Sequence, residues 1–189
     1  QRVGLARALA TDPEVLIADE PTASLDLLSR LQALRLVRSL QVDNGLAALF
    51  ISHDIGAVSL VSDRVAVMYL GKIVEQGPVR SVLERPQHPY TAALLAAVPG
   101  VDWRERREMG FSSIAGEVPS IRSIPTGCAF HPRCVYAVDR CKTESPAEMS
   151  LGDPGHVVAC WRAGQVELGR PNGRAGRTWL LVDQARASR

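Results

Sequence analysis

Two adjacent carboxylates that directly follow a short apolar run constrain this chain more than any other feature. Residues 15–18 read Val-Leu-Ile-Ala, and Asp19 and Glu20 come next. An apolar run without alternation is typical of a parallel β-strand covered on both faces. Ligands of open α/β sheets bind at the carboxyl ends of such strands. A second run, over 47–52, ends in the same way at His53, so the two runs predict neighbouring strands that deliver polar side chains to one sheet edge.

The rest of the hydrophobic pattern predicts alternating helices and strands. We expect helices over 1–11, 27–42, 55–62, 79–83 and 90–98, and strands over 15–18, 47–52, 64–70 and 73–76. Gly45 is the predicted stop of the long helix. Gly71-Lys72 is predicted to join the last two strands in an antiparallel hairpin on the sheet edge. This alternation predicts an α/β fold, with a parallel sheet and flanking helices.

The character of the sequence changes after Gly77-Pro78. Beyond Pro99-Gly100 the chain is loop-rich, and it carries all four cysteines. We therefore expect an α/β domain over 1–78, a small cysteine-containing appendage over 79–162, and a tail rich in Gly and Arg over 163–189. Residues 179–183 faintly resemble the opening strand of a second domain of the first kind.

Composition excludes several classes of protein. The net charge is only +2 in 189 residues, and the charges are interspersed, so an electrostatic nucleic-acid binder is not expected. Charged residues interrupt every apolar stretch well before the roughly 18 residues that span a bilayer. Four clustered cysteines are too few for a secreted disulfide scaffold and suit a metal or cluster site in the cytosol.

The polar residues at the two strand ends are the pattern expected for half of an ATP-hydrolysis site. Asp19 is placed to hold Mg²⁺, because this ion prefers hard oxygen ligands. Glu20 is placed to polarise the attacking water, and His53 to sense the γ-phosphate. The other half, a Gly-rich phosphate loop that ends in Lys-Ser/Thr, is missing from the sequence. We therefore expect the C-terminal part of a longer protein, without measurable ATPase activity by itself.

Three short motifs surround these residues: the opening Gln-Arg-Val…Ala-Arg-Ala-Leu, Asp-Glu-Pro-Thr followed by Ser-Leu-Asp, and Ile-Ser-His-Asp. An isolated Asp-Glu pair is most often a solvated strand end, but this combination closely resembles the ATPase domain of ABC transporters. The resemblance covers residues 1 to about 77 and implies Mg-ATP as the cofactor. It implies that Asp19 belongs to the Mg²⁺ site, Glu20 is the catalytic base, Asp26 is the D-loop aspartate and His53 is the switch histidine. In that family the P-loop, the Q-loop and the LSGGQ signature lie upstream.

A second set of motifs narrows the family. The segments are QHPYTAALLAAVP over 87–99, GEVP over 116–119, GCAFHPRC over 127–134 and GHVVAC over 155–160. They are similar to the C-terminal pattern of the oligopeptide/dipeptide (and nickel) importer subfamily. The resemblance implies an energy-coupling ATPase subunit, peripheral at the cytoplasmic face of the cell membrane. Its implied partners are transmembrane permease subunits, a second identical or different ATPase subunit and, indirectly, an extracytoplasmic substrate-binding protein.

All four cysteines, Cys128, Cys134, Cys141 and Cys160, lie in the appendage. Four thiolates in one small unit can form a tetrahedral set for Zn²⁺ or anchor an iron–sulfur cluster. No CxxC or zinc-finger spacing chooses between them, and the resemblance favours a [4Fe-4S] cluster. The alternative is four buried, reduced cysteines that act as small hydrophobic residues.

Two other functions fit parts of the sequence. A soluble ABC ATPase of DNA repair or translation shares the hydrolytic half, but the segment 87–99 and the cysteines argue against it. A truncated, non-enzymatic remnant with a metal-binding or iron–sulfur appendage fits the missing phosphate loop. Whether this chain by itself is an enzyme therefore stays open at the level of sequence, and an ATPase is expected only in the intact protein.

Overall fold

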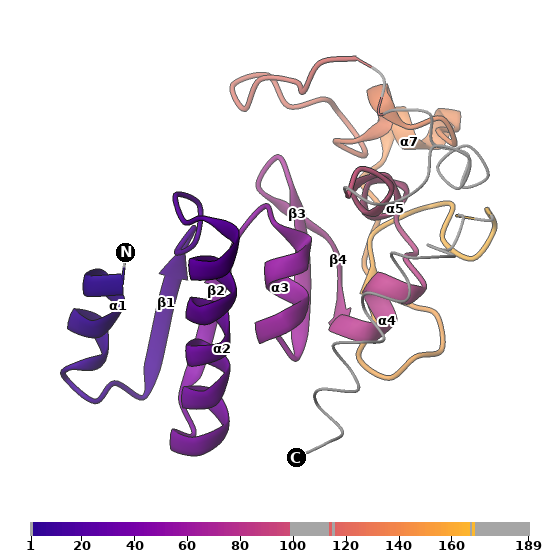
Figure 1. The fold of residues 1–189 in the computed structure, drawn as a ribbon. Coiled ribbons are helices and arrows are strands. Elements are labelled where there is room, and N and C mark those ends of the chain that lie inside the picture. The colour runs from indigo at the N-terminus through magenta and orange to yellow at the C-terminus, as the bar shows by residue number, and fades with distance from the viewer. Residues whose placement is uncertain (1, 99–113, 115, 167, 169–189) are drawn as a thin grey trace. The chain divides into compact units, whose positions relative to one another are not determined.

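The computed structural model describes residues 2–98, 114, 116–166 and 168 (Figure 1). The chain divides into two compact units, residues 1–63 and 64–189, and each is described by itself. The boundary predicted at residue 78 falls inside the second unit. Most of the expected tail, with the predicted strand at 179–183, lies outside the described residues.

The first unit is built around a two-stranded parallel sheet. In chain order it contains α1 (Arg2–Leu9), β1 (Val15–Asp19), α2 (Leu27–Asn44), β2 (Ala47–Ile51) and α3 (Ile55–Val61). β1 and β2 pair in parallel, and Asp19 is opposite Ile51 at the carboxyl end. Figure 1 shows α2 running alongside both strands. The predicted order of helices and strands in this part of the chain is confirmed, and both strands end at the same edge.

The core of the first unit lies on one face of this sheet. Its buried residues on α2 and α3 are Leu34, Val37, Ala57 and Val61. In β1, Leu16 and Ala18 are buried, whereas Val15 and Ile17 are 60% and 68% exposed. The prediction of a strand covered on both faces is therefore wrong within the described residues. Successive side chains of a strand point to opposite faces, and the described helices bury only one of those faces.

The long helix α2 begins and ends at residues with specific capping roles. The Asp26 side chain accepts hydrogen bonds from the backbone nitrogens of Leu28 and Ser29, both at 3.0 Å. Gly45 follows the helix with a φ of 68°, and its N–H donates to the Leu40 carbonyl. Glycine adopts this left-handed conformation at little steric cost. The predicted stop at Gly45 is confirmed.

The second unit is built on a four-stranded antiparallel sheet in the order β3-β4-β6-β5. β3 (Arg64–Tyr69) and β4 (Lys72–Pro78) form the hairpin predicted at Gly71-Lys72. β5 (Met149–Ser150) and β6 (Val157–Val158) complete the sheet. The prediction that the hairpin lies on the edge of the parallel sheet is wrong within the described residues, because β3 and β4 belong to a sheet that contains neither β1 nor β2. A two-residue strand is too short to give a periodic hydrophobic signal.

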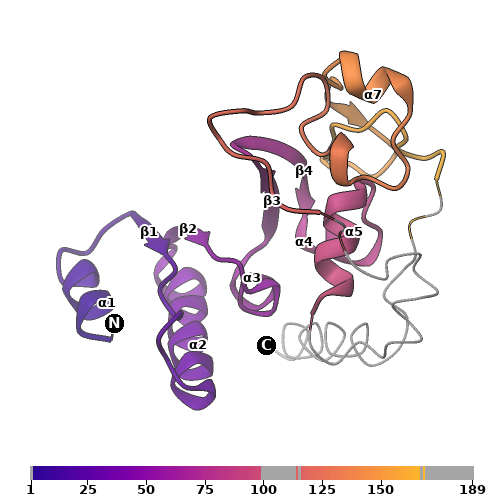
Figure 2. The ribbon, with the colours of Figure 1, turned by 90° about the horizontal axis from the view of Figure 1, so that it is seen from above.

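Short helices and an aromatic core complete the second unit. The helical elements are α4 (Val79–Glu84), α5 (Pro89–Ala96), a 3₁₀ turn (His131–Arg133) and α7 (Asp139–Thr143), and the two helices predicted after residue 78 are present. Figure 2 shows α5 beside the loop-rich segment that carries α7. Between them, the rings of Tyr69 and Tyr90 pack around Phe130 at centroid distances of 5.2 and 5.4 Å. No helix in the described ranges combines the length and the apolar character that a bilayer crossing requires.

Candidate functional site

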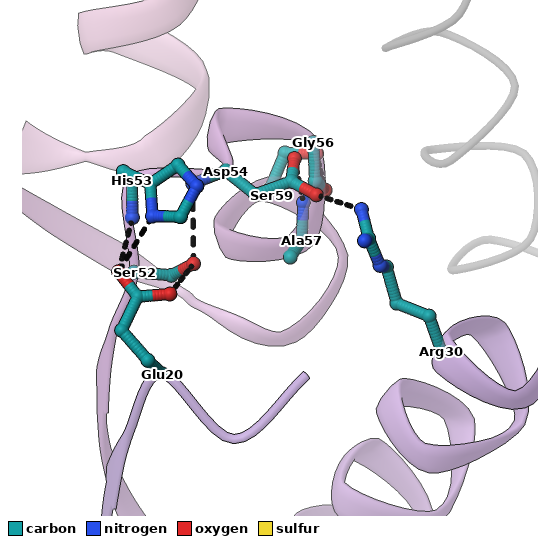
Figure 3. Close-up of polar contacts among 8 residues, drawn as sticks. All are labelled: Glu20, Arg30, Ser52, His53, Asp54, Gly56, Ala57 and Ser59. Carbon is teal, nitrogen blue, oxygen red and sulfur yellow. Dashed lines mark hydrogen bonds and ion pairs between the residues drawn. The ribbon is translucent and has the colours of Figure 1, made fainter. Parts of the chain in front are cut away.

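Glu20 directly follows β1 in an uncommon backbone conformation. Its φ of 44° lies in the left-handed region, which non-glycine residues adopt rarely and which concentrates at functional sites. Its backbone nitrogen donates to the Ile51 carbonyl at 2.9 Å, which extends the pairing of β1 with β2 by one residue. The turn places the Glu20 carboxylate beside the residues that follow β2 (Figure 3).

The Glu20 carboxylate is hydrogen-bonded to both residues that follow β2. Its Oε1 accepts a hydrogen bond from the backbone nitrogen of His53 at 3.0 Å and lies 2.7 Å from His53 Nδ1. Its Oε2 accepts a hydrogen bond from Ser52 Oγ at 3.3 Å. The hydrogen bond with the His53 side chain, followed by the smaller contributions of His53 and Ser52, lowers the pKa of Glu20. The carboxylate is therefore ionised at neutral pH.

The predicted pair of Glu20 and His53 is thus brought into direct contact. The His53 side chain is 83% exposed, and its Nδ1 is engaged with Glu20. The second ring nitrogen, Nε2, remains to contact a bound ligand. An ionised carboxylate beside an imidazole at a sheet edge can accept a proton from water and contact a phosphate at the same time.

The segment around His53 is held by residues that the sequence analysis did not single out. Ser52 Oγ accepts a hydrogen bond from the Asp54 backbone nitrogen at 3.1 Å. The Asp54 side chain accepts one from the Ala57 nitrogen at 3.1 Å and so caps α3. Arg30 of α2 donates to the same carboxylate at 2.8 Å. An Asp directly before a short helical pattern is an N-cap signal, but no local pattern indicates the partnership with Arg30.

The other two predicted site residues take no part in this network. Asp19 is the last residue of β1, and its side chain is exposed. Asp26 caps α2, and the hydrogen bonds of Ser29, followed by that of Leu28, lower the pKa of its carboxyl group. Asp26 is therefore an ionised helix cap in this structure. Its predicted role as the D-loop aspartate, and that of Asp19 at Mg²⁺, stay predictions.

The metal centre predicted at the four cysteines stays a prediction. Within the described part of the chain, which includes all four, no three His, Cys, Asp or Glu side chains are grouped as ligands for a metal ion. Cys128 and Cys134 pack against the aromatic cluster around Phe130, whereas Cys160 packs in another cluster with Val158. The four thiols nevertheless lie close enough to interact electrostatically, because Cys128, Cys141 and Cys160 each contribute to the raised pKa of Cys134.

Burial raises the pKa values of three of the four thiols. It raises the pKa of Cys134 to about 12 and the pKa of Cys160 to about 11, and it raises the pKa of Cys128 as well. Metal ligation requires thiolates. A metal ion releases the protons of its ligands when it binds, so both the metal centre and the alternative of buried, reduced cysteines that act as small hydrophobic residues stay predictions.

A buried carboxylate in the second unit was not anticipated from the sequence. The Glu75 side chain on β4 is fully buried and lies 2.7 Å from His156 Nε2. It also accepts hydrogen bonds from the backbone nitrogens of Gln87 at 2.7 Å and His88 at 3.0 Å. Glu75 therefore joins β4, the residues before α5 and the residue before β6. These partners lie in the motifs over 87–99 and 155–160, but they are distant from Glu75 in sequence, so neither motif indicates the contact.

Comparison with known proteins places the chain in a family. Residues 74–141 match the family model described as the oligopeptide/dipeptide transporter C-terminal region. The chain is 50% identical over 161 residues to a probable peptide ABC transporter ATP-binding protein, y4tS, of Sinorhizobium fredii. The match covers 85% of this chain and 44% of that protein. The chain belongs to the family of peptide ABC transporter ATP-binding proteins.

Other members of the family match this chain with similar identity and coverage. The chain is 44% identical over 162 residues to a putative peptide import ATP-binding protein of Brucella ovis, covering 86% of this chain and 50% of that protein. It is 43% identical over 161 residues to the dipeptide transport ATP-binding protein DppF of Haemophilus influenzae, covering 85% and 48%. The chain spans about half the length of the curated relatives it matches. The family predicted from the motifs is confirmed.

Proposed function

We propose that this chain carries the hydrolytic half of the ATP-binding subunit of a peptide ABC importer. The observation that carries the proposal is the contact between Glu20 and His53 at the carboxyl ends of two parallel strands. The similarity to proteins named as peptide transport or peptide import ATP-binding proteins supports peptides as the cargo. In this role ATP hydrolysis drives transport, and the cargo is not chemically altered.

Each site residue then has a role that suits its position. The ionised Glu20 carboxylate orients the attacking water and accepts its proton. His53 holds Glu20 through Nδ1 and presents its second nitrogen to the γ-phosphate. Asp19, at the end of β1, is placed to hold Mg²⁺, which neutralises charge on the transferring phosphate. Asp26 is positioned by α2 at the end of the loop that begins at Glu20, and we assign it to the D-loop.

This chain alone and the complete protein are expected to differ in ATPase activity. Phosphoryl transfer depends mainly on positioning and charge stabilisation, and backbone amides with a lysine supply these at the β- and γ-phosphates in P-loop enzymes. That Gly-rich loop is absent from the 189 residues. We therefore expect no measurable ATPase activity from the chain alone and ATP hydrolysis by the complete protein.

The proposed partners follow from the same assignment. In the complete protein the subunit would pair with a second ATPase subunit and bind transmembrane permease subunits at the cytoplasmic face of the membrane. An extracytoplasmic substrate-binding protein would act with it indirectly. The match over residues 74–141 to a transporter-specific region argues against a soluble ABC ATPase of DNA repair or translation.

Peptide uptake tests the proposal. Cells that carry the complete gene as their only copy would be assayed for uptake of a radiolabelled dipeptide and of a longer peptide. Glu20→Gln keeps the shape of the side chain and removes its basicity. It should therefore abolish ATP-dependent uptake of whichever of the two peptides the wild type takes up. Glu14→Gln is the matched control, because Glu14 is an exposed carboxylate just before β1. Equal uptake by the Glu20→Gln variant and the wild type would refute the proposal.

A further inference from the structure

A continuous series of hydrogen bonds joins helix α2 to the Glu20 carboxylate (Figure 3). Arg30 Nη1 donates to Asp54 Oδ2 at 2.8 Å. The Asp54 backbone nitrogen donates to Ser52 Oγ at 3.1 Å, and Ser52 Oγ donates to Glu20 Oε2 at 3.3 Å. Each step uses a different donor and acceptor, so all three bonds are formed together.

Asp54 is held from two sides. Its Oδ1 accepts the hydrogen bond from Ala57 at the start of α3, and its Oδ2 accepts the one from Arg30. His53, the residue before it, makes two contacts with Glu20, through its backbone nitrogen and its ring. Because Ser52, His53 and Asp54 are consecutive, fixing the Asp54 side chain orients every group that contacts the Glu20 carboxylate.

Arg30 also belongs to the first turn of α2. Its backbone nitrogen donates to the Asp26 carbonyl at 2.9 Å, and the Asp26 side chain caps the same turn. The segment from Glu20 to Asp26 is therefore connected to the Glu20 carboxylate at both of its ends. One end is Glu20 itself, and the other is linked to the carboxylate by the hydrogen bonds of Arg30, Asp54 and Ser52. This closed arrangement links the position of the capped turn to that of the Glu20–His53 pair.

The ion pair between Arg30 and Asp54 is not expected to contribute much to the stability of the fold. The Arg30 and Asp54 side chains are 32% and 31% exposed, and ion pairs that water reaches contribute little to stability. The same helix carries another such pair, Arg38 with Asp63 at 3.1 Å, which lies away from the carboxylate network. In contrast, a misplacement of about 1 Å at a catalytic group can lower a rate about 100-fold.

We propose that Arg30 is a positioning residue for ATP hydrolysis, which acts through Asp54 and Ser52 on the Glu20–His53 pair. The inference rests on the proposed function, because it assigns Arg30 a part in that reaction. It predicts that the loss of Arg30 lowers the rate of the chemical step without weakening the binding of ATP, and that another cation at this position restores part of the rate.

The test is the steady-state ATPase activity of the purified complete protein, with kcat, KM for ATP and the midpoint of thermal unfolding measured for each variant. Arg30→Ala should lower kcat about tenfold and leave KM within about twofold. Arg30→Lys should recover part of that loss, because the ammonium group still pairs with a carboxylate. Arg38→Ala is the matched control, with the same helix and the same kind of ion pair, and should keep the wild-type kcat. Arg30→Ala and Arg38→Ala should unfold at similar temperatures.

A second variant tests the route through Asp54. Asp54→Asn keeps an oxygen to cap α3 and removes the charge that Arg30 contacts, so it should lower kcat to a similar extent. The double variant with Arg30→Ala should be no slower than either single variant. Equal kcat for Arg30→Ala and Arg38→Ala, or multiplicative losses in the double variant, would overturn the inference. ATP turnover that persists in Glu20→Gln would instead overturn the proposed function, so the two failures are distinguishable.

Discussion

Replacing Glu75 with glutamine should destabilise the second unit strongly, although the two side chains have nearly the same shape. The carboxylate accepts three hydrogen bonds, from Gln87 N and His156 Nε2 on Oε1 and from His88 N on Oε2. An amide keeps one oxygen and turns an NH₂ donor toward the remaining partner. A buried donor left without an acceptor costs about 1–3 kcal/mol, and the loss of a charged acceptor for His156 costs about 1 kcal/mol more. The expected loss is therefore about 2–4 kcal/mol.

Urea unfolding followed by tryptophan fluorescence measures this loss. All three tryptophans lie between residues 64 and 189, so the signal reports on the second unit. Glu84→Gln is the matched control, because Glu84 pairs with Arg80 on the surface of α4 at 2.9 Å, where an ion pair is worth at most about 1 kcal/mol. If Glu75→Gln and Glu84→Gln shift the unfolding free energy equally, the buried carboxylate does not have the role described here.

Three further predictions concern the second unit. Burial lowers the pKa of His88 from its ordinary value of 6.5 to about 4, so the free energy of unfolding should fall by roughly 3 kcal/mol as the pH drops through this range. His88→Asn, which keeps an acceptor for Tyr90 N, should remove this fall, and a wild type without it would contradict the assignment. Gly127→Ala should cost at least about 2 kcal/mol, because the added Cβ would meet a carbonyl oxygen of α7 at 2.4 Å. Gly116 has a similar φ and open space around it, so Gly116→Ala should lower the free energy of unfolding by only about 1 kcal/mol in the same urea assay. A larger loss for Gly116→Ala than for Gly127→Ala would be inconsistent with the structure. Burial raises the pKa of Cys134 to about 12, so iodoacetamide should alkylate this thiol at least about tenfold faster in the unfolded chain than in the folded one. Mass spectrometry measures the two alkylation rates. Equal rates would show that the thiol is accessible in the folded chain.

Local signals in the sequence were sufficient for the order of elements in the first unit. Asp26 caps a helix at its start and Gly45 ends it, and each role depends on a residue's own conformational or hydrogen-bonding preference. The apolar runs before Glu20 and His53 predicted strands, and parallel pairing then required their carboxyl ends to meet. The contact between Glu20 and His53 follows from that geometry.

The features that the sequence did not reveal depend on contacts between distant residues. The run before Asp19 does not alternate between apolar and polar residues. It therefore does not predict that Ile17 is exposed while Leu16 is buried. Glu75 and His156 are 81 residues apart, and the motif over 155–160 that contains His156 does not indicate Glu75 as its partner. The spacing of the cysteines likewise does not show that packing places them in different apolar clusters.

If Glu20 is the base of an ATP-hydrolysis site, ATP turnover by the complete protein must depend on its carboxylate. Wild type and Glu20→Gln would be compared for ATP binding, with a fluorescent analogue, and for phosphate release. Binding of ATP should be unchanged in Glu20→Gln, and turnover should fall by about 100-fold or more. Phosphate release by Glu20→Gln at the wild-type rate, with ATP bound equally well, would contradict it.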